Sequence, residues 1–263
     1  LQASGGTVEG GGASRDHSER MLAQMGANIS YGLDSITIQP GKIKSTDIVV
    51  PGDFSSAAFP IAAALMTGGR IQLRNISLNP SRLGFLETIQ SMGVQHQLHS
   101  TRLLCGEPVG DLEVLGGSKL QGITVPLERV PSMIDELPLL GVLACQAHGK
   151  SVVRGAKELR VKESDRIHAM VTNLRAMGVE VEEFSDGFEI EGPQQLCGAT
   201  LSSFGDHRIA MAFSIAALSA STASKITDID CIDISFPCFH SLMKKLGADI
   251  AVKKGKSNDQ NCN

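Results

Sequence analysis

Four amphipathic segments of this chain end in the same way, with an apolar residue, a glycine and then a strand-like piece. Glycine directly after a helix is a common stop signal, because it accepts a left-handed backbone. The repeated ending predicts an internal repeat of one supersecondary unit. The four segments read "ERMLAQMGANI", "GFLETIQSMGV", "MVTNLRAMGVEV" and "HSLMKKLGADI", with glycines at Gly26, Gly93, Gly178 and Gly247.

Three further segments are apolar on nearly every face, which predicts helices buried inside a domain. Strand-like pieces rich in Val, Ile and Leu follow two of them, at residues 70–73 and 151–154, and "VEVEEF" alternates as a half-exposed strand does. The fold class predicted is therefore α/β, with buried helices inside and sheets outside. The three apolar segments are "SSAAFPIAAALMTGG", "DELPLLGVLACQAHG" and "HRIAMAFSIAALSAS".

The repeat also predicts the domain boundaries. Residues 1–48 form the last part of one unit, "VVPGDFSS" at 49–56 opens a second domain that runs to residue 252, and the polar, non-periodic residues 253–263 form a disordered tail. "LQASGG" resembles the last turn of a helix with a glycine stop, so we expect the chain to begin inside a structural unit.

Composition narrows the class of protein. With 42% hydrophobic and 20% charged residues, a net charge of -4 and a pI near 6.0, the chain is typical of soluble globular proteins. This balance gives no reason to expect a nucleic acid or an anionic membrane as partner. Neither a membrane-spanning apolar run nor a signal peptide is recognisable, and the six cysteines lack metal-site or disulfide spacing. We therefore expect a cytoplasmic protein without metal or cofactor.

An aspartate precedes or opens each of the three buried segments: Asp53, Asp135 and Asp206. One interpretation is helix capping, in which the carboxylate accepts hydrogen bonds from the first free backbone N–H groups. In a second interpretation, the starts of the three helices point toward the same end of the domain. Together they would form a positively polarised surface for phosphate or carboxylate.

Arg15, Arg166 and Arg208 each fall where a first helical turn is predicted. A cation there opposes the helix dipole by about 0.3–1 kcal/mol when exposed, and neighbouring acids could neutralise that penalty. The other interpretation is that these guanidinium groups bind the carboxylate or phosphate of a substrate. Both interpretations stay open at this level.

Asp135, Glu163 and Lys162 are candidates for proton transfer, provided that burial and mutual attraction shift their pKa values toward neutrality. His207 could support them, whereas His168, one turn into its helix, is expected at the surface. The sequence contains no Walker loop and no GxGxxG nucleotide fingerprint.

Five motifs in order resemble the 5-enolpyruvylshikimate-3-phosphate (EPSP) synthase family, the 3-phosphoshikimate 1-carboxyvinyltransferases, over residues 1–252. The related UDP-N-acetylglucosamine enolpyruvyl transferases share the fold but are not expected to combine the KESDR and DHR motifs. "SRDHSE" and "MIDELP" resemble the class II branch, many of whose members tolerate glyphosate. The five motifs are "SRDHSERML", "VPGDFSSAAF", "RVKESDRI", "GDHRIAMA" and "SFPCF".

The resemblance implies the enolpyruvyl transferase fold, an inside-out α/β barrel in which each of two domains contains three βαβαββ units. It implies that residues 1–48 belong to the domain on the shikimate-phosphate side and residues 49–252 to the domain on the phosphoenolpyruvate side. The implied reaction transfers the enolpyruvyl group of phosphoenolpyruvate to the 5-hydroxyl of shikimate 3-phosphate and releases phosphate. The product leads to chorismate and the aromatic amino acids.

The resemblance also assigns roles by position. Asp135 matches the aspartate that accepts the hydroxyl proton, Glu163 matches an acid that acts at the phosphoenolpyruvate methylene, and Lys162 matches a lysine on shikimate 3-phosphate. Ile234 stands where class I members have a phosphoenolpyruvate-binding lysine. The substrate-binding positions implied are Arg15, Lys162, Arg166, Asp206, His207 and Arg208.

Three family segments, of the "GSKS", "NAGT" and "SAQ" types, do not occur here, so the resemblance covers the C-terminal part of the family pattern. The enolpyruvyl transferase fold is therefore expected to be incomplete at the N-terminus. Residues 1–48 would expose apolar surface, which favours a homodimer or pairing with a complementing N-terminal fragment. Two functions remain: an active transferase, or an inactive chain that binds only anionic ligands or a partner chain.

Overall fold

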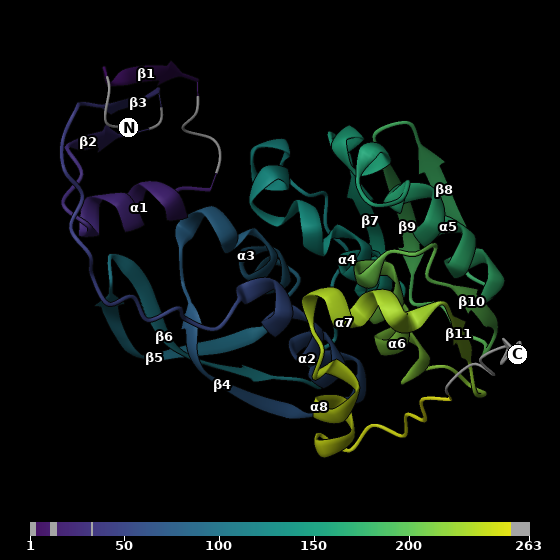
Figure 1. Ribbon diagram of the computed structural model, residues 1–263. Coiled ribbons are helices and arrows are strands. Elements are labelled where there is room, and N and C mark those ends of the chain that lie inside the picture. The colour runs from purple at the N-terminus through teal and green to yellow at the C-terminus, as the bar shows by residue number, and fades with distance from the viewer. Residues whose placement is uncertain (1–3, 11–14, 33, 254–263) are drawn as a thin grey trace, which may run out of the picture.

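The computed structural model describes residues 4–10, 15–32 and 34–253 and has two regions (Figure 1). The described residues of the N-terminal region form a helix and a small sheet, and the larger region holds the remaining elements. The tail expected at 253–263 lies outside the described residues, except for Lys253.

The N-terminal region consists of β1 (Gly6–Glu9), α1 (His17–Gln24), β2 (Ile29–Tyr31) and β3 (Ser35–Ile38). The three strands pair antiparallel in the order β1-β3-β2. None of the described residues between positions 4 and 48 is buried. Residues 41–50 contain neither helix nor strand and lead from this region to the larger one.

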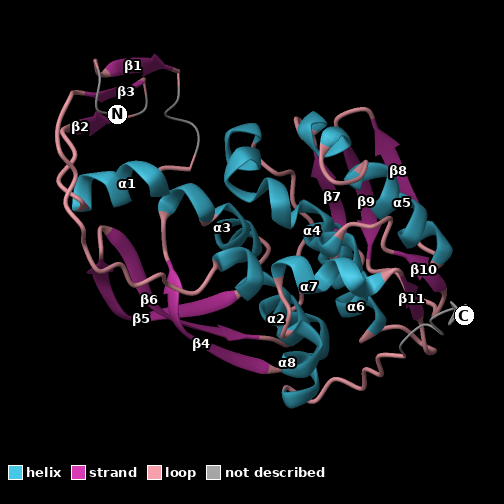
Figure 2. Ribbon diagram, in the orientation of Figure 1, coloured by secondary structure: helices cyan, strands magenta, loops and turns pink. Residues whose placement is uncertain are grey.

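The larger region contains the three buried helices that the sequence predicted: α2 (Phe54–Thr67), α4 (Leu137–Ala144) and α6 (His207–Ala217). They contact one another, and all eight residues of α4 and eight of the eleven of α6 are buried. Figure 2 shows these helices between the sheets, which lie on the outside. The prediction of buried helices inside and sheets outside is confirmed.

Two of the outer units have the same architecture. In the first, β4 (Arg70–Ser77), β5 (Gln95–Leu104) and β6 (Glu107–Leu115) form an antiparallel sheet of order β4-β6-β5, accompanied by α3 (Gly84–Ser91). In the second, β7 (Gly149–Val153), β8 (Val181–Phe184) and β9 (Gly187–Gly192) form the sheet β7-β9-β8, accompanied by α5 (Arg166–Ala176).

The third unit differs, because its sheet consists of two parallel strands, β10 (Thr200–Ser202) and β11 (Lys225–Thr227). It is followed by α7 (Ile232–Ser235) and α8 (Phe239–Lys245). The strand expected after Gly247 is wrong, since residues 248–253 form no ladder within the described part of the chain. The residues have the composition of a strand, but pairing requires a neighbouring edge.

Within the described residues, four 3-10 helices connect these elements: η2 (Pro80–Arg82), η3 (Leu127–Glu136), η4 (Lys157–Val161) and η5 (Ile229–Cys231). All four glycines of the repeated helix ending adopt a positive φ, between 79° and 99°, as the stop signal requires. No helix in the described residues is long and apolar enough to cross a membrane.

Candidate active site

Two of the buried helices begin at an aspartate that caps them. A carboxylate oxygen of Asp53 accepts a hydrogen bond from the Ser56 N–H of α2 at 2.8 Å, and one of Asp206 accepts from the Arg208 N–H of α6 at 2.9 Å. The capping interpretation is therefore confirmed for both aspartates. Asp135 differs, because it lies at the end of η3 and its carboxylate faces side chains.

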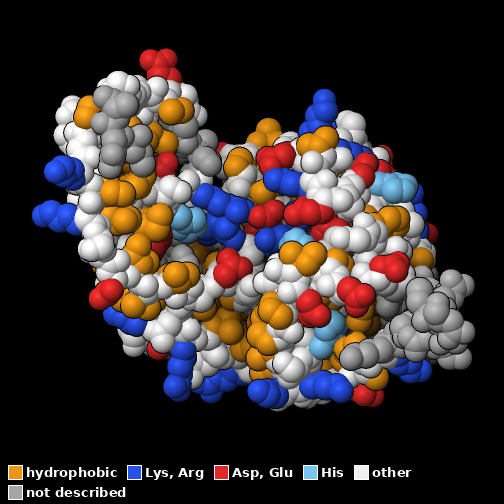
Figure 3. All heavy atoms as spheres, viewed as in Figure 1, with side chains coloured by type: hydrophobic (Ala, Val, Ile, Leu, Met, Phe, Trp, Pro, Cys, Tyr) orange, Lys and Arg blue, Asp and Glu red, His pale blue; other side chains and the backbone are white. Residues whose placement is uncertain are grey.

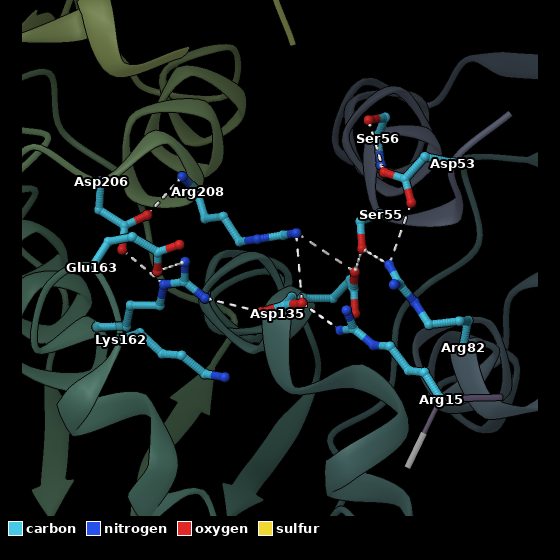
Figure 4. A network of polar contacts seen from close by, with 12 residues as sticks. Arg15, Asp53, Ser55, Ser56, Arg82, Asp135, Lys162, Glu163, Asp206 and Arg208 are labelled. Atoms are coloured by element: carbon cyan, nitrogen blue, oxygen red, sulfur yellow. Dashed lines mark hydrogen bonds and ion pairs between the residues drawn. The ribbon is translucent and has the colours of Figure 1, made fainter. Parts of the chain in front are cut away.

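Three arginines converge on the Asp135 carboxylate (Figure 4). Arg166 donates from Nη1 to Oδ1 at 3.0 Å, Arg15 donates from Nη2 to Oδ2, and Arg208 Nη2 lies 3.6 Å from Oδ2. Arg15 comes from the N-terminal region and the other two from the larger region. The contacts at Asp135 therefore join the two regions.

Arg166, the first residue of α5, is 1% exposed. Besides Asp135, it donates from Nε to Asp206 Oδ2 at 2.7 Å and from Nη2 to Glu163. Burial lowers the pKa of this guanidinium, but its carboxylate partners, Asp206 foremost, outweigh burial and raise that pKa above its usual value. A buried charge of this kind requires such paired, hydrogen-bonded partners.

The Asp135 carboxyl is 12% exposed and stays ionised. Burial acts to raise its pKa, and the positive charges of Arg208, Arg15 and Arg166 together outweigh burial and hold the pKa far below the usual range. The Asp135 carboxylate therefore already balances part of the positive charge that an anionic ligand would meet at this site.

Arg208 is the arginine with the most freedom to take a ligand. Its guanidinium lies 3.6 Å from Asp135 Oδ2 and 3.7 Å from Glu136 Oε1, beyond ordinary hydrogen-bond length. Within the described residues no side-chain hydrogen bond of this guanidinium is present, so its donors remain available to a carboxylate or phosphate.

The other site residues expected from the sequence are Glu163, Lys162 and His207, and only the first is hydrogen-bonded to the arginines around Asp135. Glu163 makes this contact through Arg166, whereas Lys162 is held by Glu158 of η4 and does not pair with Asp135. His207 is half-buried at the start of α6, and burial, followed by the charge of Arg208, lowers its pKa.

The structure also decides where Arg15 and His168 lie relative to their helices. Arg15 does not lie in a first helical turn, as the sequence had suggested, because α1 begins at His17 with Asp16 as its N-cap. This position frees the Arg15 side chain to reach Asp135. His168 is exposed, as expected for a surface residue of α5.

Three members of the network were not predicted from the sequence: Ser55, Arg82 and Glu136. Ser55 Oγ donates to Glu136 Oε1 and accepts from Arg82 Nη2, and both Arg82 and Glu136 are buried. Burial raises the pKa of Glu136, with Arg208 opposing that effect. Only their positions in the sequence could have indicated two of these residues: Glu136 directly follows Asp135, and Ser55 lies at the start of a predicted buried helix.

Figure 3 shows charged side chains of both signs gathered across the middle of one face, between the N-terminal region and the larger region. Among the described residues no group of His, Cys, Asp and Glu side chains has the arrangement to hold a metal ion. What these side chains can do is bind an oxyanion through arginines and exchange protons through carboxylates and a histidine.

Comparison with known proteins agrees with this chemistry. The family model described as EPSP synthase (3-phosphoshikimate 1-carboxyvinyltransferase) matches residues 5–243. A 3-phosphoshikimate 1-carboxyvinyltransferase of Thermodesulfovibrio yellowstonii is 47% identical over 236 residues, which are 89% of this chain and 55% of the relative. One of Geobacter metallireducens is 47% identical over 237 residues, with the same coverage. The chain thus spans about half the length of the curated relatives it matches.

Solved structures give the same result. An EPSP synthase from Acinetobacter baumannii aligns with a TM-score of 0.88 and 38% identity, over 92% of this chain and 57% of that one. A second structure of EPSP synthase from the same organism aligns with a TM-score of 0.89 and 36% identity, over 96% and 59% of the two chains. The predicted enolpyruvyl transferase fold, represented in part, is confirmed.

Proposed function

Because this chain belongs to the EPSP synthase family, we propose that it takes part in enolpyruvyl transfer from phosphoenolpyruvate to the 5-hydroxyl of shikimate 3-phosphate. The observation that carries the proposal is the convergence of Arg15, Arg166 and Arg208 on Asp135. Both substrates are polyanions, so three arginines around one carboxylate supply charge for binding and a base for chemistry.

In this proposal Arg208 and Arg166 bind phosphoenolpyruvate. Arg208 does so first, since its nearest carboxylates lie 3.6 and 3.7 Å away. Arg166 contributes the donors that now hold Asp135 and Glu163 and keeps its bond to Asp206. Asp206 and His207 support the two arginines from the start of α6.

The proposed chemistry has two stages. The 5-hydroxyl oxygen adds to C2 of phosphoenolpyruvate, its proton passes to Asp135, and C3 gains a proton from Glu163. The tetrahedral intermediate then loses phosphate from C2 as C3 returns its proton to Glu163, and the phosphate leaves with the proton that Asp135 took, so both carboxylates are restored. This assigns a base and an acid to opposite ends of the reacting double bond.

Substrate binding would itself prepare Asp135 as a base. Its carboxyl is now a weak base, because the charges of the arginines hold its pKa far below the usual range. Anionic ligands that bind Arg15 and Arg208 compete with Asp135 for the donors of these arginines, and they bring negative charge close to Asp135. Both effects raise the pKa of Asp135 toward the range in which proton transfer is efficient.

Lys162 and Arg15 are proposed to contact shikimate 3-phosphate. Arg15 reaches the cluster from the N-terminal region, and Lys162 would exchange its exposed partner Glu158 for the ligand. An exposed ion pair contributes about 0–1 kcal/mol, so this exchange is inexpensive.

The test is phosphate release from shikimate 3-phosphate plus phosphoenolpyruvate by the purified chain, with Asp135→Asn as control. We expect release that Asp135→Asn reduces by about 10²–10⁴-fold, the usual contribution of a general base. Release equal to that of Asp135→Asn excludes transferase activity for this chain alone.

A second candidate function follows from length, because the chain spans about half of its curated relatives. The chain would then bind phosphoenolpyruvate or phosphate without turning it over, since positioning of both substrates contributes much of such catalysis. Calorimetric binding that Arg208→Ala abolishes, without phosphate release, supports this alternative.

We also propose a partner chain, either a second copy or a complementing fragment of the same family, on the N-terminal region. The support is that none of its described residues is buried, and that Val8, Met21 and Tyr31 are 60%, 42% and 39% exposed. Sedimentation should show a dimer or larger species, and a monodisperse monomer excludes the second copy.

The division into residues 1–48 and 49–252 is proposed as a division into domains. It is supported by residues 41–50, which contain neither helix nor strand and are exposed except for the half-buried Thr46. Limited proteolysis should cut first between positions 41 and 47. Earlier cleavage inside the larger region counts against this boundary.

A further inference from the structure

One buried amide connects the N-terminal region to the larger region. Asn79 is 0% exposed and lies in the segment that enters η2. Its Oδ1 caps η2 by accepting from Ser81 N at 2.9 Å and from Ser81 Oγ at 2.7 Å. Its Nδ2 donates to Asp16 Oδ1 at 2.7 Å and to Glu107 Oε2 at 3.0 Å. The oxygen therefore acts within the larger region, and the nitrogen reaches across to α1.

Further contacts hold α1 against the larger region beside Asn79. His17 Nδ1 lies 2.6 Å from Glu107 Oε1, and Arg20 donates from Nη1 to the Gly106 carbonyl at 3.2 Å. A side chain at Gly106 would meet the Arg20 carbonyl at 3.3 Å, so α1 rests closely on the turn between β5 and β6. We call Asp16, His17, Arg20, Asn79 and Glu107 the joint.

The joint has consequences for the N-cap of α1. Asp16 occupies the N-cap position but makes no side-chain cap bond, because its two oxygens accept from Asn79 and Arg20. A cap normally contributes about 1 kcal/mol to a helix. In α1 the N-cap residue Asp16 instead attaches the helix to the larger region through Asn79.

The joint also lies next to the candidate site. Arg15, which binds Asp135, directly precedes Asp16 in the chain. On the other side, η2 ends at Arg82, whose Nη2 donates to Ser55, the partner of Glu136. Contacts therefore run in a closed ring from Arg15 through the joint and η2 back to the segment that carries Asp135.

From this ring we infer that Asn79 is a positioning residue, whose Nδ2 fixes the start of α1 so that Arg15 lies on Asp135. The inference rests on the contacts of the chain alone. Its consequence for binding shikimate 3-phosphate rests, in addition, on the proposed function.

Two variants separate the two roles of Asn79. Asn79→Asp keeps an oxygen that can cap η2, but it replaces the Nδ2 donor by a negative charge facing Asp16 and Glu107. Ser81→Ala is the matched control, because it removes a bond from the capping side and leaves the Nδ2 contacts in place.

The first measurement is amide hydrogen exchange of the full chain. Asn79→Asp should speed exchange in α1 by about tenfold or more, without a change in α2, because local opening of α1 becomes easier. Ser81→Ala should leave exchange in α1 as it is. Unchanged exchange in α1 of Asn79→Asp overturns the inference.

The second measurement is the Arg15 side-chain Nε–Hε signal in ¹⁵N NMR, assigned by its loss in Arg15→Lys. In Asn79→Asp this signal should move to the position that it takes in Asp135→Asn, where Arg15 has lost its partner. A general loss of stability would not move it selectively. A signal that stays at the position of the unsubstituted chain overturns the positioning role.

Calorimetry with shikimate 3-phosphate completes the test. Asn79→Asp and Arg15→Ala should each weaken binding about tenfold, and the double variant should be no weaker than Arg15→Ala. Additive losses overturn the inference, since the two residues would then act independently. If the unsubstituted chain does not bind this ligand, the proposed function fails, and the exchange and NMR measurements alone decide the positioning role.

Discussion

The helices α1 and α5 begin with similar residues but have different surroundings. Each has an aspartate at its N-cap and an arginine beside it, Asp16 with Arg15 and Asp165 with Arg166. α5 buries seven of its eleven residues, whereas α1 buries none. Similar local patterns therefore produce helices in both regions, but burial depends on what packs against them.

The same difference appears at Asp135, which both arginines bind. Arg166 is 1% exposed and has three carboxylate partners, whereas the Arg15 side chain is 39% exposed and is paired with Asp135 alone among the described residues. One arginine is thus built into the core of the larger region, and the other is carried to it by the joint. The comparison predicts that equal substitutions in the two regions have unequal effects.

The largest difference is expected for apolar residues. Phe213 of α6 is 0% exposed, so Phe213→Ala should lower the free energy of unfolding by about 4 kcal/mol through lost contacts and a cavity. Met21→Ala in α1 should change it by about 0.5 kcal/mol or less. Urea denaturation followed by circular dichroism measures both, and equal losses would show that the two regions are packed alike.

A somewhat smaller difference is expected for the arginines. Arg166→Met should lower the free energy of unfolding by about 3 kcal/mol, because Asp206 and Asp135 lose the partner of a buried pair. Arg15→Met should cost about 0–1 kcal/mol, as exposed ion pairs do. A cost for Arg15→Met that matches Arg166→Met would contradict the distinction.

Acid should weaken the larger region through Asp135. The pKa of this carboxyl is lowered by folding, so its contribution to stability is present above the unfolded pKa, about 3.9, and is lost as pH falls through the folded pKa. Asp135→Asn should therefore flatten the fall in unfolding free energy at acid pH.

Glu136→Gln serves as a control, because folding shifts the pKa of Glu136 in the direction opposite to that of Asp135. The pKa of Glu136 is raised by folding, so its contribution is present below the unfolded pKa, about 4.3, and is lost as pH rises through the folded value. Denaturation midpoints measured at several pH values separate the two substitutions. Parallel pH profiles for both variants would refute the opposite shifts.

The smallest effect concerns the N-caps. Asp165 accepts from the His168 N–H at 3.0 Å and also pairs with Arg160 at 3.0 Å, so Asp165→Ala should destabilise the protein by about 1 kcal/mol. Asp165→Ser should restore the part of that loss that belongs to the cap. At Asp16, alanine and serine should be equally destabilising, because this carboxylate accepts from Asn79 and Arg20 instead of helix amides. Restoration by Asp16→Ser would contradict the attachment role.

Apolar patterns and glycine stops were enough to predict the main helices, because both act locally. Continuous apolar runs placed the buried helices α2, α4 and α6, and the glycine stop placed the turn at Gly178. The strand prediction failed at residues 248–253, where strand formation requires a neighbouring edge. Family motifs then added the fold and the candidate residues, which neither spacing nor composition contains.

The site was predictable only in part. Charged motifs indicated Asp135, Arg166 and Arg208, but the burial of Arg82 and Glu136 depends on tertiary packing that has no periodic signal. Asn79 was missed for the same reason. An asparagine before a proline indicates a turn by local rules, and only the folded chain brings Asp16 and Glu107 to its amide nitrogen.

The residue after Asn79 also affects how the joint ages chemically. Asparagine side chains are hydrolysed to aspartate most readily when the backbone nitrogen of the next residue attacks the side-chain amide and forms a cyclic imide. That nitrogen belongs here to Pro80, which carries no hydrogen and cannot close the ring. The amide that attaches α1 to the larger region is thereby protected against the backbone-assisted reaction that would convert it into the repulsive carboxylate.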